Sequence, residues 1–180
     1  MIPRLIFKAG KLSSLLFIFT FFMQSFAYSQ NQADVMKKAV QDSSKDIVIH
    51  QEVNFKVPPQ KLYQLLLSSK EFSASTRKSF SVFSENSATI DPTVGGSFSL
   101  FDGHIIGRIL ELVPNKRIVE AWRVVDWPPG KYSIVSFELS SNGSGTHLSF
   151  YHIGFPEGLK EHLSTGWQQH YWDAFNNYFQ

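Results

Sequence analysis

The spacing of apolar residues changes near the C-terminus of this chain, and that change limits the folds available to it. Between residues 97 and 153, short runs of alternating apolar and polar residues are separated by turn-forming residues, which is typical of antiparallel β-strands. Beyond Pro156 the apolar period becomes helical, and we expect one long amphipathic helix. Such a helix packs most simply across the apolar face of the sheet. Its expected apolar stripe is Leu163, Trp167, His170, Tyr171, Ala174, Phe175 and Tyr178.

Turn and helix-breaking residues divide the rest of the domain into elements. Pro58-Pro59 ends a strand over residues 47–55 and begins a helix that runs to residue 68, and a second short helix is expected over 70–75. Asp102-Gly103 has the pattern of a two-residue hairpin turn. The predicted fold class is α+β, with one antiparallel sheet and a C-terminal helix. The later strands are expected over residues 97–101, 104–112, 117–124, 132–139 and 146–153.

The first 29 residues have the order of a secretory signal peptide. Their only charges are Arg4, Lys8 and Lys11, which precede an apolar run over residues 12–22 and the small-x-small sequence Ala27-Tyr28-Ser29. We expect cleavage after Ser29 and export to the periplasm or the cell exterior. The alternative is an uncleaved leader that anchors the protein in a membrane, although the apolar run is short for a spanning helix. Residues 30–44 are polar and are predicted to be a linker before a domain over residues 45–180.

Charge and cysteine content exclude several classes of function. The leader contains three of the 17 basic residues and none of the 15 acidic ones, so the mature chain has a formal net charge of −1. It has no basic block, and we predict no nucleic-acid partner. The absence of cysteine excludes thiol catalysis, cysteine zinc sites and iron–sulfur clusters.

Histidine spacing argues against a metal site. His147 and His152 are an odd number of residues apart on one predicted strand, so they face opposite sides of the sheet. His162 and His170 are eight apart on the predicted helix, about 12 Å along its axis. No Gly-x-Ser-x-Gly elbow is present, and no Lys-Ser/Thr follows Gly95-Gly96 as in a phosphate loop. We therefore predict no metal, no cofactor and no catalytic group.

Several separate sequence blocks follow one another along the domain: residues 72–77 (FSASTR), 94–103 (VGGSFSLFDG), 112–119 (LVPNKRIV), 121–123 (AWR), 126–133 (DWPPGKYS), 154–156 (GFP), 166–169 (GWQQ) and 171–172 (YW). In sequence and in order they resemble the domain shared by activators of heat shock protein 90 ATPase, a family within the START-like, or SRPBCC, superfamily. The resemblance implies a helix-grip fold, in which a curved sheet wraps around the long C-terminal helix.

The resemblance implies a co-chaperone or protein-interaction role, but two features depart from the family. Eukaryotic activators carry an additional N-terminal domain that has no counterpart in this sequence, and the leader would carry the protein away from a cytosolic chaperone. We therefore expect weak or missing stimulation of the chaperone's ATPase.

The preferred hypothesis is a non-enzymatic protein that binds an apolar small molecule between sheet and helix. Aromatic and apolar residues on the two facing surfaces would either fill this space as a core or line a pocket. His152 would be a polar contact for the ligand, the general acid or base of a cyclase-like enzyme, or a hydrogen-bonded core residue; the pattern favours the last. Trp127, in a predicted turn, would either anchor a protein partner or pack over its loop. The cavity candidates are Trp122, Leu148, Phe150, His152, Trp167, Tyr171 and Phe175.

Overall fold

The computed structural model describes residues 48–78 and 87–180, which lie in one compact unit, Asp46–Gln180. The predicted signal peptide (1–29) and linker (30–44) lie outside the described residues. None of the described helices is both long enough and apolar enough to cross a membrane.

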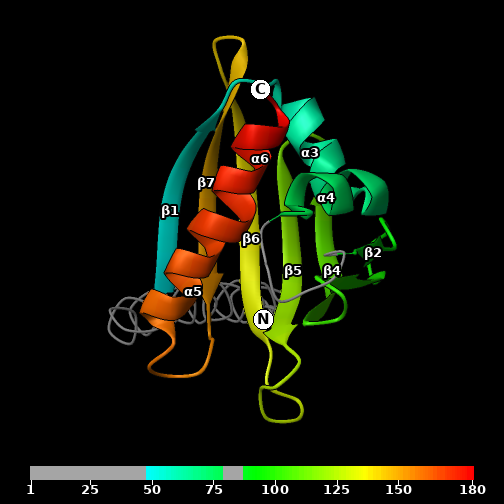
Figure 1. The fold of residues 1–180 in the computed structure, drawn as a ribbon, viewed down its shortest axis with the longest axis vertical. Coiled ribbons are helices and arrows are strands. Elements are labelled where there is room, and N and C mark those ends of the chain that lie inside the picture. The colour runs from blue at the N-terminus through cyan, green and yellow to red at the C-terminus, as the bar shows by residue number, and fades with distance from the viewer. Residues whose placement is uncertain (1–47, 79–86) are drawn as a thin grey trace, which may run out of the picture. The chain divides into compact units, whose positions relative to one another are not determined.

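A seven-stranded antiparallel sheet forms the framework of the domain, with strand order β1-β7-β6-β5-β4-β3-β2 (Figure 1). Consecutive strands pair from β2 to β7, and β1 closes the order beside β7, with Val48 opposite Ile153 and Phe55 opposite Thr146. The sheet is therefore a meander whose first strand returns to the last, which confirms the predicted fold class. Its strands are β1 (Val48–Phe55), β2 (Thr89–Ile90), β3 (Ser97–Leu100), β4 (Ile105–Val113), β5 (Arg117–Val124), β6 (Ser133–Asn142) and β7 (Gly145–Ile153).

Two short helices follow β1, as predicted from the sequence. Helix α3 (Pro59–Leu67) begins with a proline, whose missing N–H costs nothing in the first turn. Helix α4 (Ser69–Thr76) is capped by the Ser68 hydroxyl, which accepts a hydrogen bond from the Glu71 N–H at 3.2 Å. Both helices lie on the same side of the sheet as the C-terminal helix (Figure 1).

The C-terminal helix contains a π-helical turn that the sequence did not predict. It consists of α5 (Lys160–Trp167), η1 (Gln168–Trp172) and α6 (Asp173–Tyr178). Because the N–H of Asp173 bonds to the carbonyl of Gln168, five residues earlier, the following residues are rotated about the helix axis. Beyond this turn the predicted stripe is confirmed at Phe175, which is fully buried, but it is wrong at Tyr178, which is 43% exposed. The prediction also omitted Trp172, which is completely buried.

The predicted hairpin at Asp102-Gly103 is present, with β3 and β4 paired antiparallel, but its turn has four residues, 101–104, instead of two. Phe101, Asp102 and Gly103 all have positive φ angles, of 53°, 55° and 91°. This backbone directs the Phe101 ring inward, where its centroid lies 5.6 Å from that of Phe72 and 5.4 Å from that of Tyr171. A bulky residue normally avoids a positive φ angle, and burial of the Phe101 ring offsets this cost.

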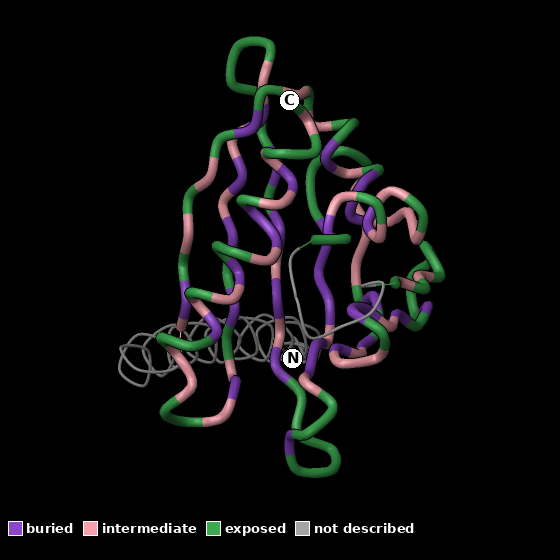
Figure 2. Tube along the Cα trace, in the orientation of Figure 1, coloured by how far each residue is buried: buried purple, intermediate pink, exposed green. Residues whose placement is uncertain are grey.

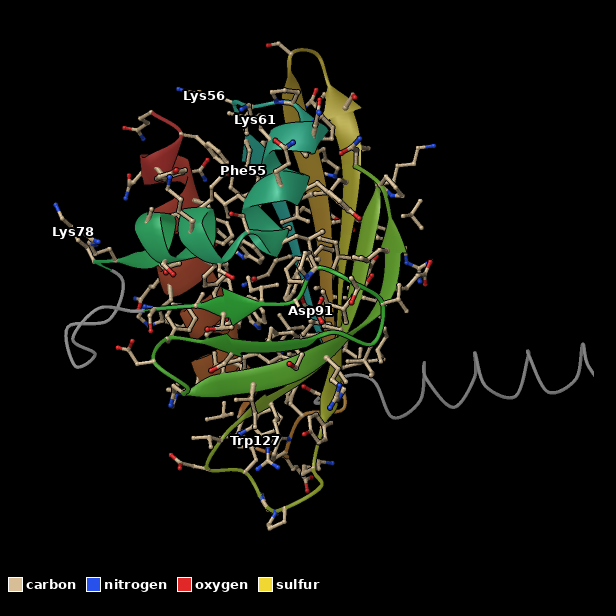
Figure 3. All side chains as sticks on the ribbon, turned by 90° about the vertical axis from the view of Figure 1, so that its right-hand side faces the viewer. Phe55, Lys56, Lys61, Lys78, Asp91 and Trp127 are labelled. Carbon is tan, nitrogen blue, oxygen red and sulfur yellow. The ribbon has the colours of Figure 1, made fainter. Side chains whose placement is uncertain are left out.

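The core lies between the concave face of the sheet and the helices. Buried positions alternate along the central strands and follow one side of the C-terminal helix (Figure 2). In the orthogonal view, side chains fill the layer between sheet and helices (Figure 3). This layer contains the residues that the sequence predicts to line a cavity, so it determines whether a binding site exists.

Candidate ligand pocket

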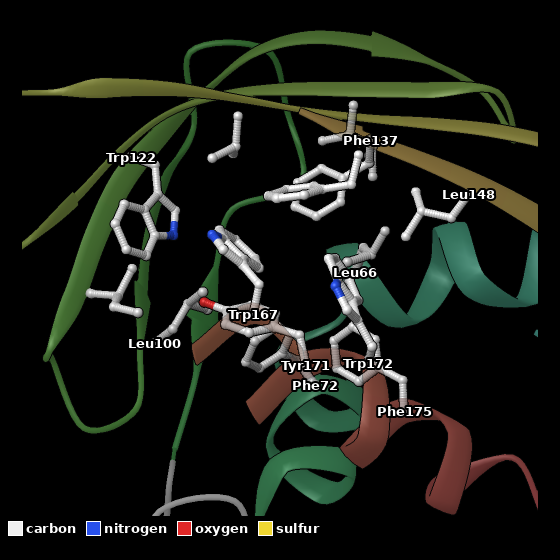
Figure 4. Close-up of a cluster of buried hydrophobic side chains, with 14 of the residues drawn as sticks. Leu66, Phe72, Leu100, Trp122, Phe137, Leu148, Trp167, Tyr171, Trp172 and Phe175 are labelled. Atoms are coloured by element: carbon white, nitrogen blue, oxygen red, sulfur yellow. The ribbon is translucent and has the colours of Figure 1, made fainter. Parts of the chain in front are cut away.

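Aromatic rings occupy most of the space between the sheet and the C-terminal helix (Figure 4). The Trp167 ring lies at the centre, with centroid distances of 4.4 Å to Phe150, 4.1 Å to Tyr171 and 5.6 Å to Trp172. Phe150 also packs against Phe137 at 5.3 Å. Close-packed rings of this kind leave little room for a second molecule. The cavity candidates Leu148, Phe150 and Phe175 are thus core residues, each fully buried.

His152 belongs to a continuous chain of hydrogen bonds inside this core. The Trp167 indole donates to His152 Nδ1 at 2.9 Å, which leaves the imidazole proton on Nε2. Nε2 then donates to Ser133 Oγ at 2.7 Å, and the Ser133 hydroxyl donates to the carbonyl of Trp122 at 2.8 Å. Every donor and acceptor in the chain is therefore used once.

This arrangement assigns His152 a structural position. Burial lowers the pKa of His152 to about 3, so the ring is neutral. Both ring nitrogens are already bonded, and neither can exchange a proton with a substrate without breaking the chain. The cyclase-like alternative therefore gains no support from His152.

Trp127 lies in the connection between β5 and β6, at the end of the sheet (Figure 3). Its side chain is only 8% exposed and packs against Trp122, with ring centroids 5.5 Å apart. The Arg123 guanidinium donates to the Trp127 carbonyl, which fixes the loop. Of the two interpretations left open by the sequence, the geometry matches a residue packed over its loop, and it presents no exposed indole to a partner.

One small pocket remains at the edge of this aromatic core. Its volume is about 80 Å³, and it is partly open to solvent. The sequence-predicted residues Trp122, Trp167 and Tyr171 line it, whereas Leu148, Phe150, His152 and Phe175 do not. The complete lining is His104, Ile105, Trp122, Val124, His162, Leu163, Gly166, Trp167, His170 and Tyr171. The pocket is thus bounded by the β3–β4 turn, β4, β5, α5 and η1.

Two polar atoms of the lining residues are buried next to each other. They are the indole Nε1 of Trp122 and the hydroxyl of Tyr171, and these two residues are 2% and 4% exposed. Burial raises the pKa of the Tyr171 hydroxyl, which therefore keeps its proton, and a hydrogen bond from the Trp122 indole acts in the opposite direction. The two groups are therefore each other's partners, although the hydrogen bond between them falls short of ordinary geometry.

A third buried polar group lies nearby on β5. Glu120 is 8% exposed and faces the core two residues before Trp122. Burial raises its pKa to about 8, so the carboxyl is protonated at neutral pH. Its charge, when present, raises the pKa of Tyr171. Sequence reasoning missed this residue, because a single glutamate in a strand is usually exposed.

Three histidines line the outer part of the pocket: His104 from the turn, His162 from α5 and His170 from η1. Partial burial lowers the pKa of His104, and His162 acts in the same direction, while nearby Asp126 opposes both. The sequence could not reveal this grouping, because the chain separates His104 from the helix by more than fifty residues. These histidines are not placed to share a metal ion, and no group of three or more His, Asp or Glu side chains in residues 48–78 or 87–180 could hold one.

Gly166 keeps one wall of the pocket open. The nearest heavy atom to a Cβ placed on this residue would be His170 Cδ2, at 3.9 Å. Alanine would therefore fit without strain, and within a helix it is favoured over glycine by about 1 kcal/mol. With glycine at position 166 the pocket is wider, and α5 is less stable, than they would be with a larger residue there.

Comparison with known proteins places this fold in a family. A family model described as Activator of Hsp90 ATPase homolog 1-like protein matches residues 56–180. The human Activator of 90 kDa heat shock protein ATPase homolog 1 is 28% identical over 125 residues, which cover 69% of this chain and 35% of the human protein. The Hsp90 co-chaperone of Saccharomyces cerevisiae is 24% identical over 131 residues, covering 72% of this chain and 36% of that protein. The chain thus spans about a third of the length of these relatives.

Solved structures agree with this placement. The crystal structure of an HSP90 activator from Plasmodium falciparum aligns with a TM-score of 0.63 and 28% identity, covering 69% of this chain and 90% of that one. A protein from Chromobacterium violaceum aligns with a TM-score of 0.59 and 25% identity, covering 73% and 96% of the two chains. The family model spans most of the described domain, and the sheet and helices have the same arrangement. This chain belongs to the Activator of Hsp90 ATPase homolog 1-like family and has its helix-grip fold.

Proposed function

We propose that this domain is a non-enzymatic binding protein for a small, largely apolar molecule that enters the pocket between the C-terminal helix and β4–β5. The observation that carries the proposal is a partly open pocket with aromatic walls in a core that is otherwise filled. A concave apolar site with a few polar groups is the usual form of a small-molecule site.

The size of the pocket restricts the ligand. Sites for drug-sized molecules measure about 300–1,000 Å³, and a cavity of about 150 Å³ encloses benzene. The present pocket, at about 80 Å³, holds one end of a small ring compound, whose remainder lies at the opening near His104 and His162. Sterols and long fatty acids exceed this space. The proposed ligand is therefore smaller than the molecule that the space between sheet and helix would hold if the aromatic core did not fill it.

A thermal-shift experiment tests this proposal. Small aromatic compounds should stabilise the folded state by mass action, by about 2.7 kcal/mol at a hundredfold excess over the dissociation constant, and so raise the melting temperature. Gly166→Leu should abolish the shift, because its side chain extends into open space in the pocket. Thr165→Leu, on the neighbouring exposed residue outside this pocket, is the matched control and should leave the shift intact. Shifts with sterols, or shifts that survive Gly166→Leu, would count against the assigned pocket.

A second candidate function is binding to an Hsp90-type chaperone. Membership of the activator family and the names of the human and yeast relatives favour it. The matched segment is about a third of those proteins, so we expect binding without strong stimulation of the chaperone's ATPase. Titration of the full chain into the chaperone, with ATP turnover followed in parallel, measures both properties. Strong stimulation at stoichiometric amounts would promote this candidate above the first.

The cellular compartment of the protein distinguishes small-molecule binding from chaperone binding. We propose that the protein is exported. The support is the order of basic, apolar and small residues over positions 1–29. Replacing Arg4, Lys8 and Lys11 by Glu should leave precursor in the cytoplasm, while the native protein should begin at or near Gln30. Mass spectrometry of the native N-terminus measures this directly. An intact leader on soluble cytosolic protein would exclude export and favour chaperone binding.

A further inference from the structure

We propose that Ser133 and His152 hold the aromatic walls of the pocket at a fixed separation and so restrict it to flat, single-ring ligands. Neither residue lines the pocket, whose aromatic walls are Trp122, Trp167 and Tyr171. Ser133 and His152 are therefore positioning residues, which act on the ligand through these walls. This inference rests on the proposed function of small-molecule binding and names the ligand class of the same site.

The first argument is that Ser133 and His152 connect the wall from the helix to the wall from the sheet. The indole of Trp167, at the end of α5, donates to His152 Nδ1 at 2.9 Å. His152, on β7, donates from Nε2 to Ser133 Oγ on β6 at 2.7 Å. The Ser133 hydroxyl then donates to the carbonyl of Trp122 on β5 at 2.8 Å. A displacement of Trp167 relative to the Trp122 backbone therefore breaks one of these hydrogen bonds.

The second argument is that Tyr171 closes the connection into a circuit. Its hydroxyl is the partner of the Trp122 indole, and Figure 4 shows the Tyr171 oxygen on the side of its ring that faces Trp122. The Tyr171 ring in turn packs on Trp167, with centroids 4.1 Å apart. Each of the three walls is thus held at two points. A ring too large for the pocket must break a contact of the circuit before it can enter.

The third argument is that the two linking residues are enclosed in the core. Ser133 is 1% exposed and His152 is 0% exposed, so bulk water does not replace a hydrogen bond that breaks there. The imidazole packs edge-on against the rings of Trp122 and Phe155, each at a centroid distance of 5.0 Å. Because an unbonded polar group in the core is costly, the circuit stays closed. Walls fixed before binding lower the ordering cost for a ligand that fits and exclude one that does not.

Two probes that differ by one fused ring, phenol and 2-naphthol, test the inference. Both are titrated into the full chain, labelled with ¹⁵N, and the dissociation constants are measured from the NMR signals of the folded protein. We expect wild type to bind phenol about 10-fold more tightly, because excess atoms in a packed site are unfavourable. Ser133→Ala removes the hydroxyl in the middle of the circuit. Phenol should then bind about 3- to 10-fold more weakly, the equivalent of one net hydrogen bond, while the binding of 2-naphthol should not weaken. The preference for phenol therefore falls towards onefold.

Ser136→Ala is the matched control, since Ser136 lies three residues further along β6 and faces the opposite side of the sheet. This variant should keep the wild-type preference. Ser133→Cys, whose thiol is a weak donor of similar size, should give an intermediate preference. It also provides the second variant if Ser133→Ala does not fold.

A purely structural role for Ser133 gives a different result. Ser133→Ala would then lower the free energy of unfolding, while the folded protein would keep its wild-type preference for phenol. That result would overturn the inference and leave small-molecule binding intact, as would a wild type that prefers 2-naphthol. If neither probe binds to wild type, the proposed function fails, and the inference fails with it.

Discussion

Replacement of Trp167 by alanine is expected to lower the free energy of unfolding by about 3–5 kcal/mol, the usual cost of deleting a buried tryptophan side chain. The ring lies 4.4 Å from Phe150 and 4.1 Å from Tyr171, so its removal leaves a cavity in the centre of the core. It also leaves His152 Nδ1 without its donor, which adds to the cost. Urea unfolding followed by circular dichroism measures the change.

Asp173→Ala is the matched control on the same helix. Asp173 is exposed, and its carboxylate accepts one exposed hydrogen bond from Gln168 at 2.8 Å. The expected loss is below about 0.5 kcal/mol. Comparable losses for the two variants would mean that the helix does not present Trp167 to the sheet.

A large effect of pH is expected from Glu120. Its pKa is about 8 in the folded protein, whereas the ordinary value for an exposed glutamate is 4.5. Between these two values the folded state retains a proton that the unfolded state releases, so stability falls as pH rises. The contribution is complete below about pH 4.5 and is lost by about pH 8, with a limiting slope of about 1.4 kcal/mol per pH unit. The total is therefore on the order of a few kcal/mol.

Glu120→Gln isolates this effect, because glutamine is similar in size and does not titrate. His152 acts in the opposite direction up to about pH 6.5, because its pKa is about 3 in the folded protein and the unfolded state binds a proton that the folded state lacks. This contribution is common to wild type and variant and cancels in their difference, and the raised pKa of Tyr171 lies above this range. The difference in unfolding free energy between wild type and variant should shift steadily in favour of the variant from pH 5 to pH 8. A constant difference across these pH values would show that the Glu120 carboxyl is solvated.

The fold was predictable because its signals are local and repeated. Alternation along β6 and β7, the prolines before α3 and the turn residues between strands each specify an element independently. The errors occurred where a single residue changed the register. The π-helical turn at Gln168–Trp172 adds one residue to a helical repeat, which moves Trp172 into the core and Tyr178 out of it.

The candidate site was only partly predictable, for a different physical reason. A pocket forms where two packed surfaces do not quite meet. Its presence depends on the positions of side chains from distant segments, which no local sequence pattern specifies. The sequence correctly brought Trp122, Trp167 and Tyr171 to the interface, but it could not distinguish lining residues from core residues such as Phe150. His104 and Glu120 were missed because their neighbours become close only in the folded sheet.

The most direct measurement of the central claim is a crystal structure of the full chain with 4-bromoacetophenone, located by the anomalous signal of bromine. The account predicts the ring of the probe in the pocket, between Trp122 and Gly166, with the bromine beside His104 and His162. An empty or water-filled pocket at a saturating concentration of the probe, or the probe bound elsewhere on the protein, would contradict it.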